Sequence, residues 1–312
     1  YSVMDMTEPG RHKQNVELVS REQTGTMGAS ATIYRMVQHD DRGVSVNITL
    51  SENGDVLEAG LGPSIKMLAE DERTAKSPGK GTLDLYLASA VPAEGRLDSS
   101  RIKSLTGMTV DLLGISPSDF LDNSRQRARS SMDATLRVSI DAGKYEPAVE
   151  IPGESCIDND CKDGKIRELA GMLKGQVKSD DKLELGLAIS AWVNRHMNYE
   201  LGVSLVNVRS IVEQARGDCL EYSRLFVAIA RAAGFHARFV SGIAWAGDKP
   251  PRFGYHAWAE LAIDGRWVPF DPTWAEYPVD ASHIKFDNEN GFSIMNHFGS
   301  LKVKIIETIY GK

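Results

Sequence analysis

Apolar and polar residues alternate along the first half of the chain, a pattern typical of β-strands. In the stretch "VSVNITL" (residues 44–50), every second residue beginning with Val44 is apolar. The pair Asn53-Gly54 follows, and this pair is the preferred chemistry of a tight hairpin turn. Residues 28–62 therefore predict a meander of antiparallel strands.

Other parts of this half carry different patterns. Residues 82–90 and 133–141 alternate again and predict two further strands. Residues 117–130 are mostly polar and begin at helix-starting serines, so they predict a short helix. Residues 1–27 are polar without a repeating pattern and predict an arm. Proline, glycine and acidic residues accumulate at 142–164, where we expect the junction between two domains.

Helical spacing replaces alternation after this junction, because apolar residues now recur three and four positions apart. Three helices are predicted, at residues 166–177, 183–197 and 207–215. A fourth begins near Cys219, is apolar nearly all round, and should be buried. Three strand-like runs follow, at residues 236–245, 255–263 and 266–271.

Together these patterns predict an α+β protein. Its three parts are a polar arm (1–27), a β-rich domain of unassigned role (28–150) and a mixed domain (151–312). A length of 312 residues suits about two domains. The net charge of −7 and the lack of a basic run argue against a nucleic-acid partner. No apolar run is long enough to span a bilayer.

Three cysteines limit the redox and metal chemistry of the chain. Cys156 and Cys161 lie close together, and they would form a small disulfide in an oxidising compartment or remain thiols in the cytosol. Two cysteines without a neighbouring histidine make a poor zinc site. The acidic residues beside them lack the spacing of a calcium loop. We therefore expect no metal site.

The third cysteine, Cys219, stands at the start of the buried helix, in "RGDCLEYSRLFVAIARAAG" (216–234). Asp218 is a good N-cap residue, and Gly234 stands where helices commonly end. The free N–H groups and the dipole at a helix start favour negative charge, and therefore the nucleophilic thiolate. The alternative is that Cys219 is only a small core residue.

A predicted hairpin brings a histidine and a carboxylate together. Asp264-Gly265 is a type I′ turn signal, and the register that it fixes places His256 diagonally across from Asp271. A histidine held by a carboxylate has its tautomer and ring direction fixed, as a general base beside a thiol requires. Pro269, inside the second strand, would shift this register if it produced a bulge.

Three motifs occur in order over about 60 residues: Gly-Asp-Cys-x-Glu (217–221), His-Ala-Trp (256–258) and Trp-Val-x-x-Asp-Pro-Thr (267–273). They resemble the motifs of the transglutaminase-like superfamily of papain-like cysteine enzymes. The resemblance covers roughly half of the chain and implies a papain-like core. It also implies roles for three residues: Cys219 as the nucleophile, His256 as the general base and acid, and Asp271 as the group that orients His256.

Further residues near these motifs are given structural or lining roles. Glu221 would pair with Arg238 or with a helix-end N–H group, and Asp218 would cap the helix. Three aromatic residues would line a substrate cleft, or only pack the hairpin: Tyr222, Trp258 and Trp274. Four histidines match no motif and are expected at surface or packing positions: His196, His236, His283 and His297.

The resemblance implies attack of a thiol on an acyl carbon, usually of an amide, through a thioester. Water then gives hydrolysis, whereas a second amine gives cross-linking, and access to the site decides between them. The short, bacterial-type form favours a peptidase or amidase acting on peptide or isopeptide bonds. A cross-linking transglutaminase is the first alternative. A non-catalytic binding or scaffold protein with a relic triad is the second.

The remaining expectations concern cofactors, partners and location. Arylamine acetyltransferases share the chemistry, but their nucleophile motif differs and nothing in the sequence marks a coenzyme A site. We therefore expect no cofactor, and a peptide or protein as the substrate. The sequence does not indicate an oligomeric state. The close cysteine pair and the first residue Tyr1 favour a periplasmic or other extracytoplasmic location in a bacterium.

Overall fold

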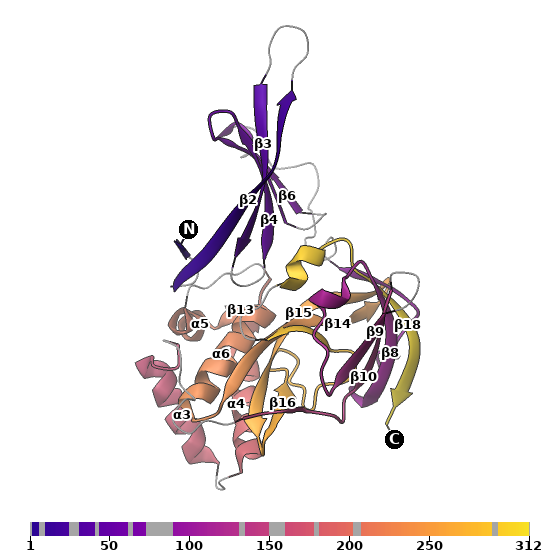
Figure 1. Ribbon diagram of the computed structural model, residues 1–312. Coiled ribbons are helices and arrows are strands. Elements are labelled where there is room, and N and C mark those ends of the chain that lie inside the picture. Colours follow the sequence, from indigo (N-terminus) through magenta and orange to yellow (C-terminus); the bar gives the residue numbers. More distant parts are fainter. Residues whose placement is uncertain are drawn as a thin grey trace.

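The computed structural model describes residues 2–5, 10–24, 31–40, 44–61, 65–72, 90–130, 135–149, 160–177, 181–201, 207–288 and 293–311. In these ranges the chain forms an N-terminal sheet that stands away from a larger sheet with helices on one side (Figure 1). The predicted α+β class is confirmed. No helix in these ranges combines the length and the apolar character needed to cross a membrane.

Six strands form the N-terminal sheet, and each pairs antiparallel with the next. They are β1 (Ser2–Asp5), β2 (Gly10–Thr24), β3 (Ala31–Asp40), β4 (Ser45–Ser51), β5 (Val56–Leu61) and β6 (Ile65–Leu68). β3 to β5 confirm the meander predicted for residues 28–62. The predicted arm over residues 1–27 is wrong, because β2 is a strand of 15 residues. A bulge between Leu18 and Ser20 interrupts its alternation, which is why the pattern did not indicate a strand.

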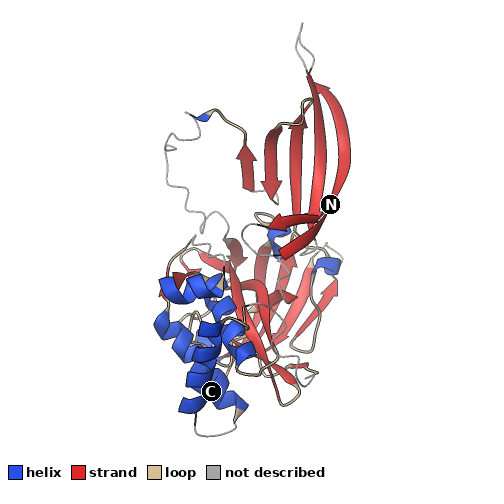
Figure 2. Ribbon diagram, turned by 90° about the vertical axis from the view of Figure 1, so that its left-hand side faces the viewer, coloured by secondary structure: helices blue, strands red, loops and turns tan. Residues whose placement is uncertain are grey.

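The N-terminal sheet is a single curved layer (Figure 2). Leu18, Met36, Ile48 and Met67 share one face of this sheet, since the strand registers place them in one row together with Ala59. Leu18 is 55% exposed and Met67 is 60% exposed. Neither hydrophobic core of the molecule contains a described residue of β1 to β6. This sheet therefore adds little to the packing that holds the rest together.

The larger sheet has ten strands. Eight follow the order β11-β16-β15-β7-β18-β8-β10-β9, β14 pairs with β15, and β17 pairs with β14. The strands from the first half are β7 (Val91–Glu94), β8 (Leu105–Leu113), β9 (Gln126–Ser130), β10 (Leu136–Asp141) and β11 (Glu146–Pro147). Those from the second half are β14 (Ala237–Asp248), β15 (Pro251–Ile263), β16 (Arg266–Phe270), β17 (Ile284–Asn288) and β18 (Lys302–Tyr310).

The expected division of the chain at residue 150 is not the division between the two sheets. β7 pairs with β15 and β18, and β11 pairs with β16, so strands from residues 91–147 complete the sheet of the second half. One hydrophobic core contains Val110 and Val138 from the first half together with Phe253 and Ile284 from the second. The change from alternating to helical spacing marks where helices begin, and a shared core carries no such local signal.

The short helix predicted for residues 117–130 is also wrong. A single 3-10 turn, η2 (Pro117–Asp119), is followed by the strand β9. Arg125 and Gln126 precede or begin this strand and are buried, because their side chains bond backbone carbonyls of residues 279–285. These long-range contacts outweigh the local polar pattern. Of the two further predicted strands, 133–141 is confirmed by β10, and residues 82–89 lie outside the described residues.

Four helices follow as predicted: α3 (Gly164–Gln176), α4 (Lys182–His196), α5 (Val208–Gln214) and α6 (Cys219–Ala232). Short strands β12 (Asn198–Tyr199) and β13 (Arg216–Gly217) pair in parallel just before α6. α6 is the central helix, because its side chains Leu225, Phe226 and Ile229 are fully buried among the other helices and the sheet. The start of α6 is thereby fixed against the strands that follow it.

The hairpin of β15 and β16 has the predicted register. Ile263 pairs with Arg266 and Glu260 pairs with Pro269, without a bulge at the proline. Asp264 and Gly265 both have positive φ, 50° and 71°, as a type I′ turn requires. The hairpin therefore delivers residues near its open end, on β15 and just after β16, to the same place.

The shared core leads to a prediction about fragments. A fragment of residues 90–312 should fold, because it keeps both hydrophobic cores. A fragment of residues 151–312 should not, because it loses Val110, Leu112 and Val138 from the second core and exposes their partners. Thermal melts followed by circular dichroism check this. A cooperative melt of the 151–312 fragment would contradict the shared core.

Candidate active site

Cys219 is the first residue of α6, and its neighbours hold the helix start rigidly. The Asp218 side chain accepts a hydrogen bond from the Leu220 N–H at 3.0 Å. The Glu221 side chain in turn accepts one from the Asp218 N–H at 3.1 Å, which completes a capping box. A Cβ on Gly217 would lie 2.5 Å from the Cβ of Glu221, so only glycine fits there. The Gly-Asp-Cys-x-Glu motif is thus a device that positions Cys219.

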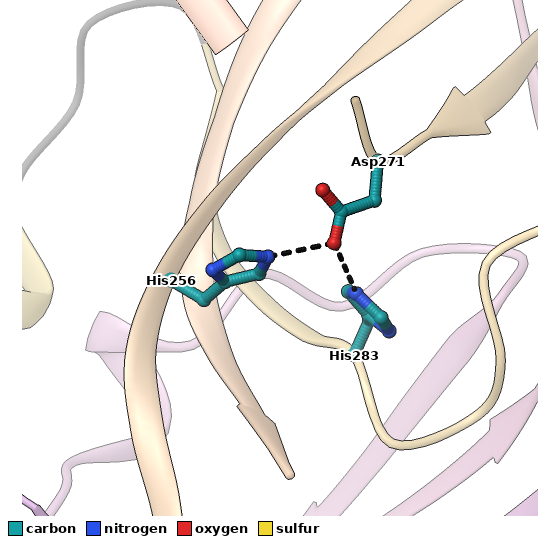
Figure 3. A group of neighbouring side chains, drawn as sticks. All are labelled: His256, Asp271 and His283. Atoms are coloured by element: carbon teal, nitrogen blue, oxygen red, sulfur yellow. Dashed lines mark hydrogen bonds and ion pairs between the residues drawn. The ribbon is translucent and has the colours of Figure 1, made fainter. Parts of the chain in front are cut away.

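His256 and Asp271 meet at the open end of the hairpin (Figure 3). His256 Nε2 is 2.8 Å from Asp271 Oδ2, and both side chains are buried. Asp271 Oδ1 accepts hydrogen bonds from the backbone N–H groups of Thr273 and Trp274, at 2.8 and 3.2 Å. Burial raises the pKa of Asp271, but His256 and His283 outweigh it and hold that pKa well below its usual range. Asp271 is therefore an anion, and His256 Nε2 donates to it.

His256 also contacts Cys219. Burial lowers the pKa of His256. Asp271 raises it by its charge and hydrogen bond, Cys219 raises it in the same two ways, and the result is a pKa of about 9. Since Nε2 bonds Asp271, the nitrogen left for Cys219 is Nδ1. Cys219 is a free thiol and is partly exposed. His256 is thus bonded to Asp271, and Cys219 is close enough to act on the same ring.

The three predicted lining residues differ from one another. Trp274 is 39% exposed and lies flat on His256, with ring centroids 4.1 Å apart and planes at 11°. Trp258 is 2% exposed and packs beside His256, with ring centroids 6.2 Å apart. Tyr222 is 3% exposed and donates its hydroxyl to the Met197 carbonyl. Their burial makes Tyr222 and Trp258 packing residues, so only Trp274 offers a surface to a substrate.

Arg238 is not part of this site. It pairs with Glu260 and with Glu146, and it lies 4.2 Å over the ring of Trp267. Lys285 joins the same buried network through both glutamates. The network links β11, β14, β15 and β17, so the role of Arg238 is to hold strands together. Of the two partners predicted for Glu221, the helix-end N–H is the one that the capping box supplies.

The structure describes one of the two cysteines in the predicted disulfide. Cys161 is disulfide-bonded, and it is completely buried. Cys156 lies outside the described residues, so the predicted bond between the two remains a prediction. The Asp163 side chain, two residues after Cys161, caps α3 by accepting from the Lys165 N–H at 2.8 Å.

Sequence reasoning missed one residue of the site. His283, expected at a surface or packing position, is 1% exposed, and its Nε2 lies 3.4 Å from Asp271 Oδ2. It follows β16 in a stretch that also contains Glu276 and Asp280. The only available signal was this density of titratable residues in 271–283, because no periodicity shows that such a segment folds back.

The other three histidines are as expected. His196 Nε2 lies 2.9 Å from the Val212 carbonyl, and His297 Nδ1 lies 3.1 Å from the Gly114 carbonyl. Both therefore donate to the backbone as packing residues. His236 is half-buried directly before β14.

Two overlapping groups could hold a metal ion by geometry. They are His256, Asp271 and His283, and Glu276, Asp280 and His283, each with ligand atoms within 4.8 Å of one another. In each group the histidine nitrogens already face carboxylates, and the paired charges compensate one another. Protonated histidines therefore balance the carboxylates of both groups without a metal ion.

The segment that carries Asp271 is tied down from the first half of the chain. Arg125 donates to the carbonyls of Val279 and Asp280, at 3.0 and 2.8 Å. The Gln126 side chain exchanges two hydrogen bonds with the backbone of Lys285. Residues 271–285 are consequently fixed at both ends, one by the hairpin and the other by β9.

Residues 171–272 match the family profile of the Transglutaminase-like superfamily. This stretch of the chain is therefore transglutaminase-like. The chain is 28% identical to the Kyphoscoliosis peptidases of Mus musculus and Homo sapiens over 138 residues. This match spans 39% of the chain but only 20% of those relatives.

Solved structures give more distant likenesses to this transglutaminase-like protein. A candidate cysteine protease from Cytophaga hutchinsonii has 18% identity and a TM-score of 0.42, and the match covers 64% of this chain and 82% of that one. The periplasmic domain of TgpA from Pseudomonas aeruginosa has 18% identity and a TM-score of 0.38, with 62% and 95% covered.

The acidic group beside Asp271 leads to a prediction about stability. Burial first, and the charges of Asp280 and Asp271, raise the pKa of Glu276 to about 7 against the opposing effect of His283. A folded-state pKa above the unfolded value means that this carboxyl stabilises the fold at low pH. That contribution is lost as the pH rises towards and through 7. Glu276→Gln, which stays neutral, should therefore be more stable relative to the native protein at pH 8.5 than at pH 5.5.

Thermal melts at the two pH values check this prediction. Glu213→Gln, at an exposed position on α5, is the matched control and should keep the native dependence on pH. The same pH dependence in Glu276→Gln as in the native protein would show that Glu276 is not held protonated by its surroundings.

Proposed function

We propose that this protein is a cysteine-dependent hydrolase of peptide or isopeptide amide bonds. Cys219 is the nucleophile, His256 is the general base and acid, and Asp271 orients His256. The observation that carries this proposal is the position of His256, which bonds Asp271 at 2.8 Å and whose pKa Cys219 helps to raise. Nucleophile, base and orienting carboxylate follow one another in this order in cysteine acyl-transfer sites.

The first half of the reaction makes a thioester. The Cys219 proton passes to His256 Nδ1, and the thiolate attacks the amide carbon, so that a C–S bond forms while the carbonyl π electrons move to oxygen. The Cys219 N–H, at the start of α6, can donate to this oxyanion. The C–N bond then breaks as the oxyanion re-forms the carbonyl. His256 gives its proton to the leaving amine.

The second half consumes water. A water molecule loses a proton to His256 as its oxygen attacks the thioester carbon. The C–S bond breaks, the carboxylic acid leaves, and the thiolate faces the protonated His256 again. Trp274, exposed and stacked on His256, and the partly exposed Cys219 leave water access to the reacting groups. This access supports hydrolysis over transfer to an amine, which requires that water be excluded. The name peptidase carried by the curated relatives also supports it.

The location is part of the proposal. The disulfide at Cys161 supports an oxidising compartment, such as the bacterial periplasm, because buried disulfides are rare in the cytosol. In that compartment the substrate would be a peptide or protein.

The pH dependence of Cys219 alkylation tests the assignment of the site. In the native protein the iodoacetamide rate should reach half its maximum at least about one pH unit below the value for an ordinary thiol, since His256 carries the proton. His256→Ala should move this midpoint upward to the ordinary value. His196→Ala removes a histidine that bonds the Val212 carbonyl, and it should leave the midpoint unchanged. An ordinary midpoint in both native protein and His256→Ala would mean a disabled site and would favour a binding protein with a relic triad.

A product experiment separates the two reactions. Peptide amides are incubated with the protein in the presence of a small primary amine, and the products are weighed by mass spectrometry. We expect mainly the free acid, and none from Cys219→Ala. A product in which the added amine has replaced the leaving group would instead identify a transferase, the cross-linking alternative.

A further inference from the structure

Two histidines share one oxygen of the buried carboxylate. Asp271 Oδ2 lies 2.8 Å from His256 Nε2 and 3.4 Å from His283 Nε2 (Figure 3). The two rings are 5.7 Å apart at an angle of 60°, so they approach the oxygen from different directions. The proposed reaction uses only His256. A second buried histidine on the same atom therefore requires its own explanation.

The surroundings of His283 make it a cation. Its Nδ1 lies 3.6 Å from Asp280 Oδ1, on the side away from Asp271. Burial lowers the pKa of His283, but the hydrogen bond to Asp271 and the nearby carboxylates of Asp280 and Glu276 raise it to about 10. Burial alone would raise the pKa of Asp280, but His283 and Ser282 outweigh burial and lower this pKa below its usual value. Charges thus alternate in a row: His256, Asp271, His283, Asp280.

Hydrogen bonds to the backbone hold the Asp280 end of this row in place. Asp280 Oδ1 accepts from the Ser282 N–H at 2.7 Å, and Glu276 Oε1 accepts from the Asp280 N–H at 2.7 Å. Arg125 holds the carbonyl of Asp280 from the first half of the chain. The ring of His283 also stands edge-on to Trp258, at 5.2 Å and 84°. His283 consequently has a fixed ring direction, as a donor to Asp271 needs.

We propose that His283 is a positioning residue that acts through Asp271: as a protonated donor to Oδ2, it keeps this carboxylate ionised and aimed at His256. The inference rests on the proposed function of Cys219 and His256. Its physical basis is the cost of a buried anion: the backbone N–H groups satisfy Oδ1, and Oδ2 has only the two histidines as partners among the described residues. With His283 charged, Asp271 is a poor proton acceptor, so the Nε2 proton stays on His256. Nδ1 then remains the nitrogen that exchanges a proton with Cys219 and the leaving amine.

A double-mutant cycle tests this inference by the alkylation of Cys219. His283→Ala should slow alkylation at neutral pH by about tenfold and raise the midpoint of its pH profile by roughly half a unit or more. In an Asp271→Asn background the same change should alter the rate by less than about twofold, because the residue through which His283 acts is already impaired. His196→Ala is the control, since His196 bonds the Val212 carbonyl and should show no coupling to Asp271.

A second variant guards against loss of the fold. If His283→Ala melts below the assay temperature, Asp280→Asn removes the counter-charge of His283 and leaves its ring in place. It should raise the midpoint in the same direction and lose this effect in the Asp271→Asn background. Equal effects of either variant with and without Asp271→Asn would overturn the positioning role while leaving the proposed function standing. An ordinary, His256-independent midpoint in the native protein would overturn both.

Discussion

The carboxylate of Asp271 is an ion with no exposed surface, and the arrangement around it follows from that constraint. An unpartnered charge in a protein interior costs several kcal/mol, on the order of its desolvation penalty. Two histidine rings and two backbone N–H groups satisfy it. To supply them, the chain after β16 must turn back on itself and return to the same point at His283. A bridge between Asp271 and Glu276 closes the first part of that turn.

The returning segment is not stable by local contacts alone. Its carbonyls at Val279 and Asp280 are held by Arg125, and the backbone of Lys285 is held by Gln126. These two residues belong to the half of the chain that carries no chemical motif. The transglutaminase-like core is thus completed by strands that lie outside the stretch matched by the family profile, residues 171–272.

The sequence predicted those parts of the site whose cause is local. The hairpin turn at Asp264-Gly265 fixes the register that joins His256 to Asp271, and the capping box at Asp218 fixes Cys219. The prediction that Cys219 acts together with His256 rested on the resemblance of motifs, because no spacing in the sequence indicates it. What escaped prediction depends on contacts between distant segments. Neither the return of His283 nor the burial of Arg125 has a periodic signature. The bulge beside Leu18 shows that one extra residue suffices to mask a long strand.

Trp274 lies flat on His256, and this contact couples binding to acidity. A cation is attracted to the face of an indole, so the stacked arrangement favours the protonated imidazole. Such coupling is reciprocal. A molecule that binds the exposed face of Trp274 and draws the ring aside therefore also makes His256 release its proton more readily, and loss of that proton in turn loosens Trp274. Binding at Trp274 and the acid strength of His256 are thus thermodynamically coupled.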